Sequence, residues 1–274
     1  MKKEERDLLI KRIEQVESST IQDEDIAYWR YHRTRYIKTL SSILKTFKKS
    51  NFSKIRILDI GSHYLHLPLI LKKYGFDVYG FDIADFTNSC LIKKRANDKK
   101  IENRTIHNSL EEGKFPYNKN EKFDLILFTE TLEHLPFRPQ KMWVEVFKLL
   151  KDEGRIYITT PNSLSIRRIS LQFLRIITRD GYGPKIDDIL SKPSYAIHWK
   201  EYSPKEIYKY FKTLGYNVEI KINFYSYKKL LRSLSPFDLI GMLINLFSFP
   251  IKHFREELEI WISLNKEKRN SCSR

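Results

Sequence analysis

The stretch KIRILDIG, from Lys54 to Gly61, decides the fold class. It is a short apolar run that ends at a glycine, which is typical of a strand buried on both faces of a parallel sheet. A helical pattern follows over residues 67–74 and stops at Gly75, and FDVYGFDI at residues 76–83 repeats the strand pattern. This order predicts parallel strands joined by a helix.

The same alternation continues along most of the chain. We expect strands at 103–108, 123–129, 155–160, 216–225 and 258–264, and helices at 140–150 and 203–215. The segment from Ser203 to Glu206 has the residues of a helix start, with Ser as N-cap, Pro in the first turn and Glu placed to close a capping box. With two N-terminal helices, the second at 26–48, this pattern predicts an α/β, doubly wound, Rossmann-like sheet.

Polar residues follow the strands at the edge where such sheets bind ligands. Asp59 and Gly61 end the first strand, and Asp82 ends the second, 82 − 61 = 21 positions beyond Gly61. An acid at that distance can accept hydrogen bonds from two ribose hydroxyls, and glycine lets the backbone approach a ligand closely. Asp59 sits between apolar strand residues, where a charge without a function would be costly, so we interpret it as a binding residue.

Four motifs in this order resemble class I S-adenosylmethionine-dependent methyltransferases, and most of all the subgroup found with surface-glycan biosynthesis. They are LDIGS…GFDI, SLEEGKFPYNKNEKFDLILFTETLEHL, LKDEGRIYITTPNSLSIRR and HWKEYSPKEIYKYFKTLGY, within residues 50–225. The resemblance implies a seven-stranded sheet and S-adenosylmethionine as cofactor. By position it implies that the methionine end is held by Asp59 and Gly61, the ribose by Asp82, the adenine by Ser109 and Leu110, and the sulfonium side by Thr129 and Glu130.

The sequence departs from the family pattern in two places. The glycine-rich loop of the family has two more glycines, where this chain has His63 and Leu65, and the acidic residue beside the adenine is replaced by Ser109. We therefore expect the loop to follow a less tight path, which bears on the affinity for the cofactor. A catalytically inactive, methyltransferase-like scaffold is the alternative that these losses favour.

Glu130, Glu133, His134 and His198 form a second candidate group. Glu130 precedes the next two by three and four positions, so one helical turn would present them together. With His198 they would offer oxygen and nitrogen ligands to Mg²⁺ or Mn²⁺. Similar E-x-x-E-H…H patterns occur in metal-dependent methyltransferases that act on the terminal ribose of small RNAs and on quinone precursors. In relatives without metal, His134 would act as a base or form a hydrogen bond across the sheet edge.

These residues predict transfer of a methyl group to the oxygen of a sugar hydroxyl, on a small-molecule or lipid-linked glycan. A hydroxyl is a poor nucleophile, so a base is needed, and His134 or His198 is the candidate, with Glu130 nearby. The alternative enzyme is a metal-dependent RNA 2'-O-methyltransferase.

The net charge of the chain indicates what kind of partner it binds. The 274 residues include 50 Lys+Arg against 34 Asp+Glu, a formal net charge of +16 that favours an anionic partner. An Arg-rich stretch at 163–179 and an apolar stretch at 230–251 would suit an anionic membrane surface. The alternative for residues 230–251 is that they cover the sheet or form a dimer interface. The lysines are scattered rather than grouped with stacking aromatics, so nucleic acid is the less favoured partner.

We divide the chain into an N-terminal helical cap at 1–48, a methyltransferase domain at 49–228, and a region at 229–274 with an apolar helical insertion, the last strand and a charged tail. The two cysteines, Cys90 and Cys272, exclude a disulfide scaffold and a cysteine zinc site. No run is long enough to span a bilayer, and the charged start has no apolar leader. We expect a cytoplasmic protein with peripheral contact to the inner face of the membrane.

Overall fold

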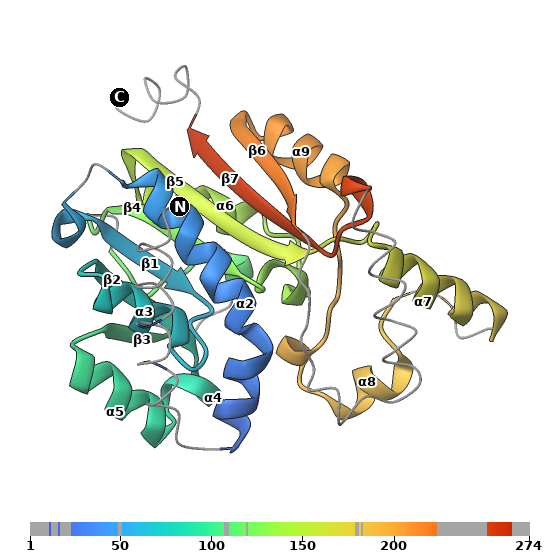
Figure 1. The fold of residues 1–274 in the computed structure, drawn as a ribbon, viewed down its shortest axis with the longest axis horizontal. Coiled ribbons are helices and arrows are strands. Elements are labelled where there is room, and N and C mark those ends of the chain that lie inside the picture. Colours follow the sequence, from blue (N-terminus) through green and yellow to red (C-terminus); the bar gives the residue numbers. More distant parts are fainter. Residues whose placement is uncertain are drawn as a thin grey trace. The chain divides into compact units, whose positions relative to one another are not determined.

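The structure is a computed structural model (Figure 1) that describes residues 11, 16, 23–48, 51–106, 110–118, 120–178, 181, 183–223 and 251–264. Two compact units are distinguished, one of residues 1–127 with 145–151 and one of residues 128–144 with 152–274. Seven strands form one sheet in the order β3-β2-β1-β4-β5-β7-β6. The expected α/β, doubly wound, seven-stranded fold is confirmed.

The first unit holds the parallel part of the sheet. Its strands are β1 Arg56–Ile60, β2 Asp77–Ile83, β3 Glu102–Ile106 and most of β4 Phe123–Thr129, and β1 pairs in parallel with both β2 and β4. Its helices are α2 Asp23–Thr46, α3 His66–Lys73, α4 Ala84–Thr87 and α5 Cys90–Lys99, with short turns η1 Phe52–Lys54 and η2 Leu110–Glu112. α3 and α4 pack on β2, α5 packs on β3, and α2 contacts α3.

The second unit holds the other edge of the sheet. Its strands are β5 Leu150–Pro161, β6 Tyr216–Asn223 and β7 Glu257–Leu264, and its helices and turns are η3 Leu132–His134, α7 Ile166–Ile177, α8 Ile186–Ser191, η4 Ser194–Ala196, α9 Pro204–Thr213 and η6 Lys252–Phe254. Helix α6 Gln140–Lys148 is divided between the units. β7 runs antiparallel to β5 and β6, so the sheet is mixed rather than wholly parallel.

Asn162 joins the end of β5 to the segment before β7. Its side-chain amide donates to the carbonyls of His253 and Arg255 at 2.9 and 2.7 Å, and its Oδ1 accepts from the Leu164 amide at 3.0 Å. The residue is fully buried, so these bonds satisfy a polar group that has no access to water. It fixes the exit of β5 at the edge where ligands bind in this fold.

The predicted elements correspond closely to the observed ones. The capping box at Ser203 and Glu206 is confirmed, because each side chain bonds to the other residue's backbone amide. Helix α5 had no sequence signal, because its buried face includes Arg95 beside Leu91 and Ile92. The first expected helix before residue 23, apart from residues 11 and 16, and the apolar stretch at 230–250 lie outside the described residues, and the three-part division of the chain stays a prediction. Among the described helices, none is long and apolar enough to cross a bilayer.

Candidate cofactor and acceptor sites

The loop after β1 keeps a tight, glycine-like path, and the expectation of a looser path was wrong. Three alternate residues have positive φ angles, Gly61 at 77°, His63 at 44° and Leu65 at 62°. The last two stand where the family has glycine, and an L-residue in this left-handed region costs about 1–2 kcal/mol. The loop therefore keeps a left-handed backbone at positions 63 and 65 although neither residue is glycine.

Packing and hydrogen bonds hold this strained loop. The amides of Gly61 and Ser62 both donate to the Phe81 carbonyl of β2, at 3.1 and 3.3 Å. The ring of His63 lies 4.3 Å from the ring of Tyr28 on α2 and 4.1 Å from that of Phe86 on α4. The side chain of Leu65 is fully buried. Burial and ring contacts offset the conformational cost that glycine would avoid, so two bulky residues can occupy glycine positions.

Asp59 is a buried carboxylate on β1. It is 2% exposed, and its Oδ1 makes no hydrogen bond to any residue that the structure describes. Burial, and then the nearby Asp82, raise the pKa of its carboxyl well above the usual range. A buried polar oxygen without a partner costs free energy, which a ligand that donates a hydrogen bond would recover. The ammonium group of a methionine moiety is such a donor, so Asp59 fits the role implied by the resemblance.

Asp82 ends β2 with both carboxylate oxygens in use. Its Oδ2 accepts from the His63 amide at 2.6 Å, and its Oδ1 accepts from the Ile83 amide at 2.7 Å. Burial raises its pKa to about 6, although these amide bonds act in the opposite direction. A carboxylate has about four lone-pair sites, so each oxygen can accept one further bond. Asp82 can therefore hold the loop and two ribose hydroxyls at once.

Helix α2 is fixed over this loop by a buried charge cluster that the sequence did not reveal. Asp25 is fully buried, forms an ion pair with Arg95 of α5, and accepts a hydrogen bond from Nε2 of His66 of α3 at 2.7 Å. Arg95 also donates to the Tyr64 carbonyl in the loop at 3.0 Å. The cluster ties three helices to the candidate cofactor loop. No motif marks such a pairing, because the partners are 41 and 70 positions apart.

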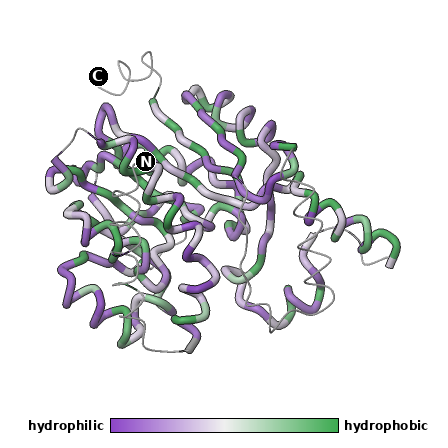
Figure 2. The backbone as a smooth tube through the Cα atoms, in the orientation of Figure 1, coloured by the Kyte–Doolittle hydropathy of each residue, from purple (hydrophilic) through white to green (hydrophobic). Residues whose placement is uncertain are grey.

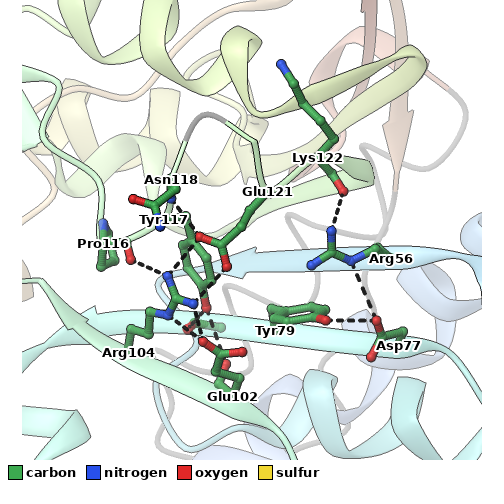
Figure 3. Close-up of polar contacts among 11 residues, drawn as sticks. Arg56, Asp77, Tyr79, Glu102, Arg104, Pro116, Tyr117, Asn118, Glu121 and Lys122 are labelled. Carbon is green, nitrogen blue, oxygen red and sulfur yellow. Dashed lines mark hydrogen bonds and ion pairs between the residues drawn. The ribbon is translucent and has the colours of Figure 1, made fainter.

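The segment after β3 carries Leu110 in η2, and it is anchored on the sheet by Arg104 and Tyr117 (Figure 3). The Arg104 guanidinium pairs with Glu121 at 2.8 Å and lies over the Tyr117 ring. The Tyr117 hydroxyl donates to the Gly80 carbonyl of β2 at 2.7 Å. Leu110 is half-buried in the same unit as Asp59 and Asp82. Ser109, the other residue expected beside the adenine, lies outside the described residues.

The chain after β4 does not form the single helical turn that was expected to present Glu130 with Glu133 and His134. Glu130 has a positive φ of 53°, its amide donates to the Thr159 carbonyl of β5, and its Oε1 accepts from the Thr159 hydroxyl at 3.1 Å. The residues that follow form the short turn η3 rather than an α-helix. Glu130 is therefore not presented with Glu133 and His134 on one helical turn, because the chain bends between them. Thr129 and Glu130 stay predictions for the sulfonium side.

The structure does bring together Glu133, His134 and His198. One potential ligand atom of each lies within 4.8 Å of the others, and the two imidazole rings meet edge to face with centroids 4.6 Å apart. Glu133 is buried, and its Oε2 accepts from the Thr160 hydroxyl at 2.9 Å. Its carbonyl accepts the amide of Trp199, which brings the segment of His198 alongside η3. Two nitrogens and one carboxylate suit a divalent metal, although Glu130, the fourth expected ligand, is not in the group.

Each imidazole of the pair has its Nδ1 engaged. Nδ1 of His134 faces the Ile197 carbonyl at 3.1 Å, and Nδ1 of His198 faces a carboxylate oxygen of Glu201 at 2.8 Å. Both acceptors require a proton on Nδ1, so in the neutral rings the lone pair is on Nε2. Burial, and then His198, lower the pKa of His134 to about 4. The carboxylate of Glu201 also pairs with Arg168 at 2.5 Å. The arrangement provides a proton acceptor whose orientation is fixed by a carboxylate.

Comparison with known proteins agrees with this fold. A family model described as a methyltransferase domain matches residues 28–220. A search of curated proteins by sequence finds no match. The solved structures with a similar fold include the YcgJ protein of Bacillus subtilis, with 17% identity and a TM-score of 0.53 over 83% of this chain and 99% of that one.

Two further solved structures show the same fold. An S-adenosylmethionine-dependent methyltransferase of Mesorhizobium loti has 12% identity and a TM-score of 0.53 over 81% of this chain and 95% of that one. The magnesium protoporphyrin IX methyltransferase of Synechocystis, solved with bound S-adenosylhomocysteine, has 12% identity and a TM-score of 0.53 over 89% of each chain. At such low sequence identities, the similarity to these proteins shows a shared fold only.

Proposed function

The chain belongs to the methyltransferase domain family and is a class I S-adenosylmethionine-dependent enzyme, and on that premise we propose that it O-methylates a sugar hydroxyl of a surface glycan or a lipid-linked saccharide. The observation that carries the proposal is the imidazole pair of His134 and His198, with Nδ1 of His198 on the Glu201 carboxylate at 2.8 Å. A hydroxyl, unlike a neutral amine, must lose its proton as it attacks, so a base held in place favours an oxygen nucleophile.

The proposal gives each residue one task. Asp59 and Asp82 bind the ammonium and ribose groups of the cofactor and so set its position. S-adenosylmethionine, when bound, supplies the methyl group. His198 accepts the hydroxyl proton at Nε2, Glu201 stabilises the imidazolium that results, and neutral His134 contacts the acceptor or His198 through its ring edge. Alignment of the reacting groups and exclusion of water account for most of the expected rate.

The sugar part of the proposal is supported by the resemblance of the sequence to methyltransferases of surface-glycan biosynthesis. The test is a methyl-transfer assay with S-adenosylmethionine labelled in the methyl group, over panels of sugars, lipid-linked saccharides and short RNAs. We expect transfer to a saccharide, and His198→Ala should lower turnover by roughly 10²–10⁴-fold with unchanged cofactor affinity. His253→Ala is the matched control, since the His253 side chain is exposed and the bond that it makes to Asn162 is through its backbone carbonyl. Equal turnover of His198→Ala and the unaltered protein would refute the assignment.

A metal-dependent RNA 2'-O-methyltransferase is the second candidate, and the group of Glu133, His134 and His198 is the observation that favours it. These residues would hold Mg²⁺ or Mn²⁺, which would supply Lewis-acid polarisation of a ribose hydroxyl. Under this candidate, EDTA abolishes transfer to RNA and Mn²⁺ restores it. Saccharide methylation that persists in EDTA supports the base mechanism instead.

A further inference from the structure

Helix α7 presents an apolar face that no described residue covers. Its sequence, IRRISLQFLRII, places Ile166, Ile169, Phe173, Ile176 and Ile177 on one side at helical spacing, and no residue of the helix is buried. Phe173 is 63% exposed and Ile177 is 62% exposed. Figure 2 shows the hydrophobic colouring along this helix. Exposed large apolar side chains in a continuous row mark a surface that meets another apolar phase.

The opposite side of α7 carries its arginines, with the exposed Leu171 among them. Arg167, Arg168 and Arg175 are its only charged residues, so the helix carries three positive charges and no negative one. The next helix, α8, adds exposed Ile186 and Leu190, and its two acids are balanced by Lys185 and Lys192 at its ends. An apolar face with arginines on the other side is the pattern of helices that lie in the plane of an anionic bilayer surface.

Arg168 connects this helix to the candidate acceptor site. Its guanidinium pairs at 2.5 Å with the Glu201 carboxylate, which also accepts from Nδ1 of His198 at 2.8 Å. The N-cap of α7, Ser165, comes a few residues after the end of β5 at Pro161, and Thr160 of that strand donates to Glu133. The apolar face and the histidine pair therefore belong to one continuous piece of structure.

We propose that α7 docks on a bilayer surface that contains anionic lipid, with its apolar face among the acyl chains and with Arg167 and Arg175 at the phosphates. The inference rests on the proposed function, since it gives the saccharide acceptor a lipid-bound setting. Charge complementarity selects this occupant, because the row of arginines disfavours a second copy of a chain with net charge +16.

The test is flotation of the full chain with vesicles that contain neither acceptor nor cofactor. One set of vesicles is phosphatidylcholine alone, and the other is an equimolar mixture with phosphatidylglycerol. We expect the protein to float only with the mixture and to be released by high salt, which screens the arginine contacts. Phe173→Glu should lower the partition coefficient by at least tenfold, and Arg167→Gln should lower it by on the order of fivefold.

Val144→Glu is the matched control, because Val144 is an exposed apolar residue on α6, at 52% exposure. It should float like the unaltered protein, and Ile177→Glu repeats the α7 test at a second position. Flotation that Phe173→Glu and Ile177→Glu leave unchanged, or no flotation with either vesicle, would overturn the inference. A dimer in light scattering that Phe173→Glu dissociates would overturn it in favour of a second copy. Cofactor binding by calorimetry is unaffected in every case, so failure here is separate from failure of the proposed function.

Discussion

Two buried carboxylates in the first unit have opposite surroundings. Asp25, in the first turn of α2, is satisfied by Arg95 and His66, whereas Asp59, near the end of β1, has an oxygen with no hydrogen-bond partner among the described residues. Burial alone would raise the pKa of Asp25, but hydrogen bonds from His66 and Arg95 bring it well below the usual range. Nothing comparable offsets burial at Asp59, and its pKa rises.

The difference separates a structural carboxylate from one kept for a ligand. A paired buried carboxylate fixes helices, and loss of its partner leaves a charge without compensation. An unpaired one lowers the stability of the empty protein and recovers that cost when a donor binds. The difference therefore predicts opposite phenotypes for substitutions at two buried carboxylates of the same unit.

The largest effect is expected at the Asp25 cluster. Arg95→Ala leaves the Asp25 carboxylate buried with one partner fewer, which should lower the free energy of unfolding by about 3–5 kcal/mol. Urea unfolding followed by circular dichroism measures this change. Lys94→Ala, at an exposed position on the same helix, should change it by less than about 0.5 kcal/mol. Equal effects of the two substitutions would show that the cluster does not hold α2.

The second prediction concerns pH. The folded-state pKa of Asp82 is raised to about 6 from 3.8, so the folded protein binds the proton more tightly than the unfolded chain. Asp82 therefore adds to the free energy of unfolding below about pH 4. This contribution, about 3 kcal/mol, is lost as pH rises through 6. Asp25 acts in the reverse direction, since its lowered pKa gives stability that is lost in acid.

The measurement is the free energy of unfolding without cofactor, in urea, at pH values between 4 and 7. The difference between the unaltered protein and Asp82→Asn should fall across this range. A difference that stays constant with pH would mean that Asp82 titrates normally in the folded protein.

The third prediction tests Asp59 itself. Asp59→Asn should leave the protein as stable as before or more stable, because it removes a buried acid whose Oδ1 has no hydrogen-bond partner among the described residues. It should weaken binding of S-adenosylhomocysteine by about 2 kcal/mol, roughly thirtyfold, through loss of a charged hydrogen bond to the ammonium group. Isothermal titration calorimetry measures the affinity. Unaltered protein that fails to bind would support the inactive-scaffold alternative, and an unchanged affinity of Asp59→Asn would refute the binding role.

The smallest effect is expected at His63. His63→Gly relieves a positive φ but loses ring contacts with Tyr28 and Phe86, so the net change in stability should be below about 1 kcal/mol. His63→Val puts a β-branched side chain at the same φ and should be less stable than the glycine variant by about 1–2 kcal/mol. Thermal unfolding of the two variants measures this difference in stability. Equal stability of the two would mean that the loop changes its path.

The sequence was sufficient for the features that depend on local pattern. Apolar runs that stop at Gly61 and after Asp82 predicted both strands and the acids at their ends, and Ser203 with Glu206 predicted the start of α9. The antiparallel direction of β7 was not predictable, because an apolar strand pattern carries no direction. The path of the loop at His63 was predicted wrongly, since neighbouring rings, and not the residue itself, hold the positive φ. Glu130 failed to join His134 because the chain bends at a positive φ there.

The amide of Asn162 has a consequence for the order in which the protein forms during synthesis. The partners of that amide lie 91 and 93 positions further along the chain, and β5 pairs with β7. All residues of the first unit have been synthesised once the chain reaches residue 151. In the second unit, β5 and β6 cannot pair with β7 until the chain has been extended to Leu264. Contacts between such distant segments form slowly, so a growing chain leaves β5 and β6 without their shared neighbour. A ribosome stalled before the last strand would carry a folded first half and an open second half.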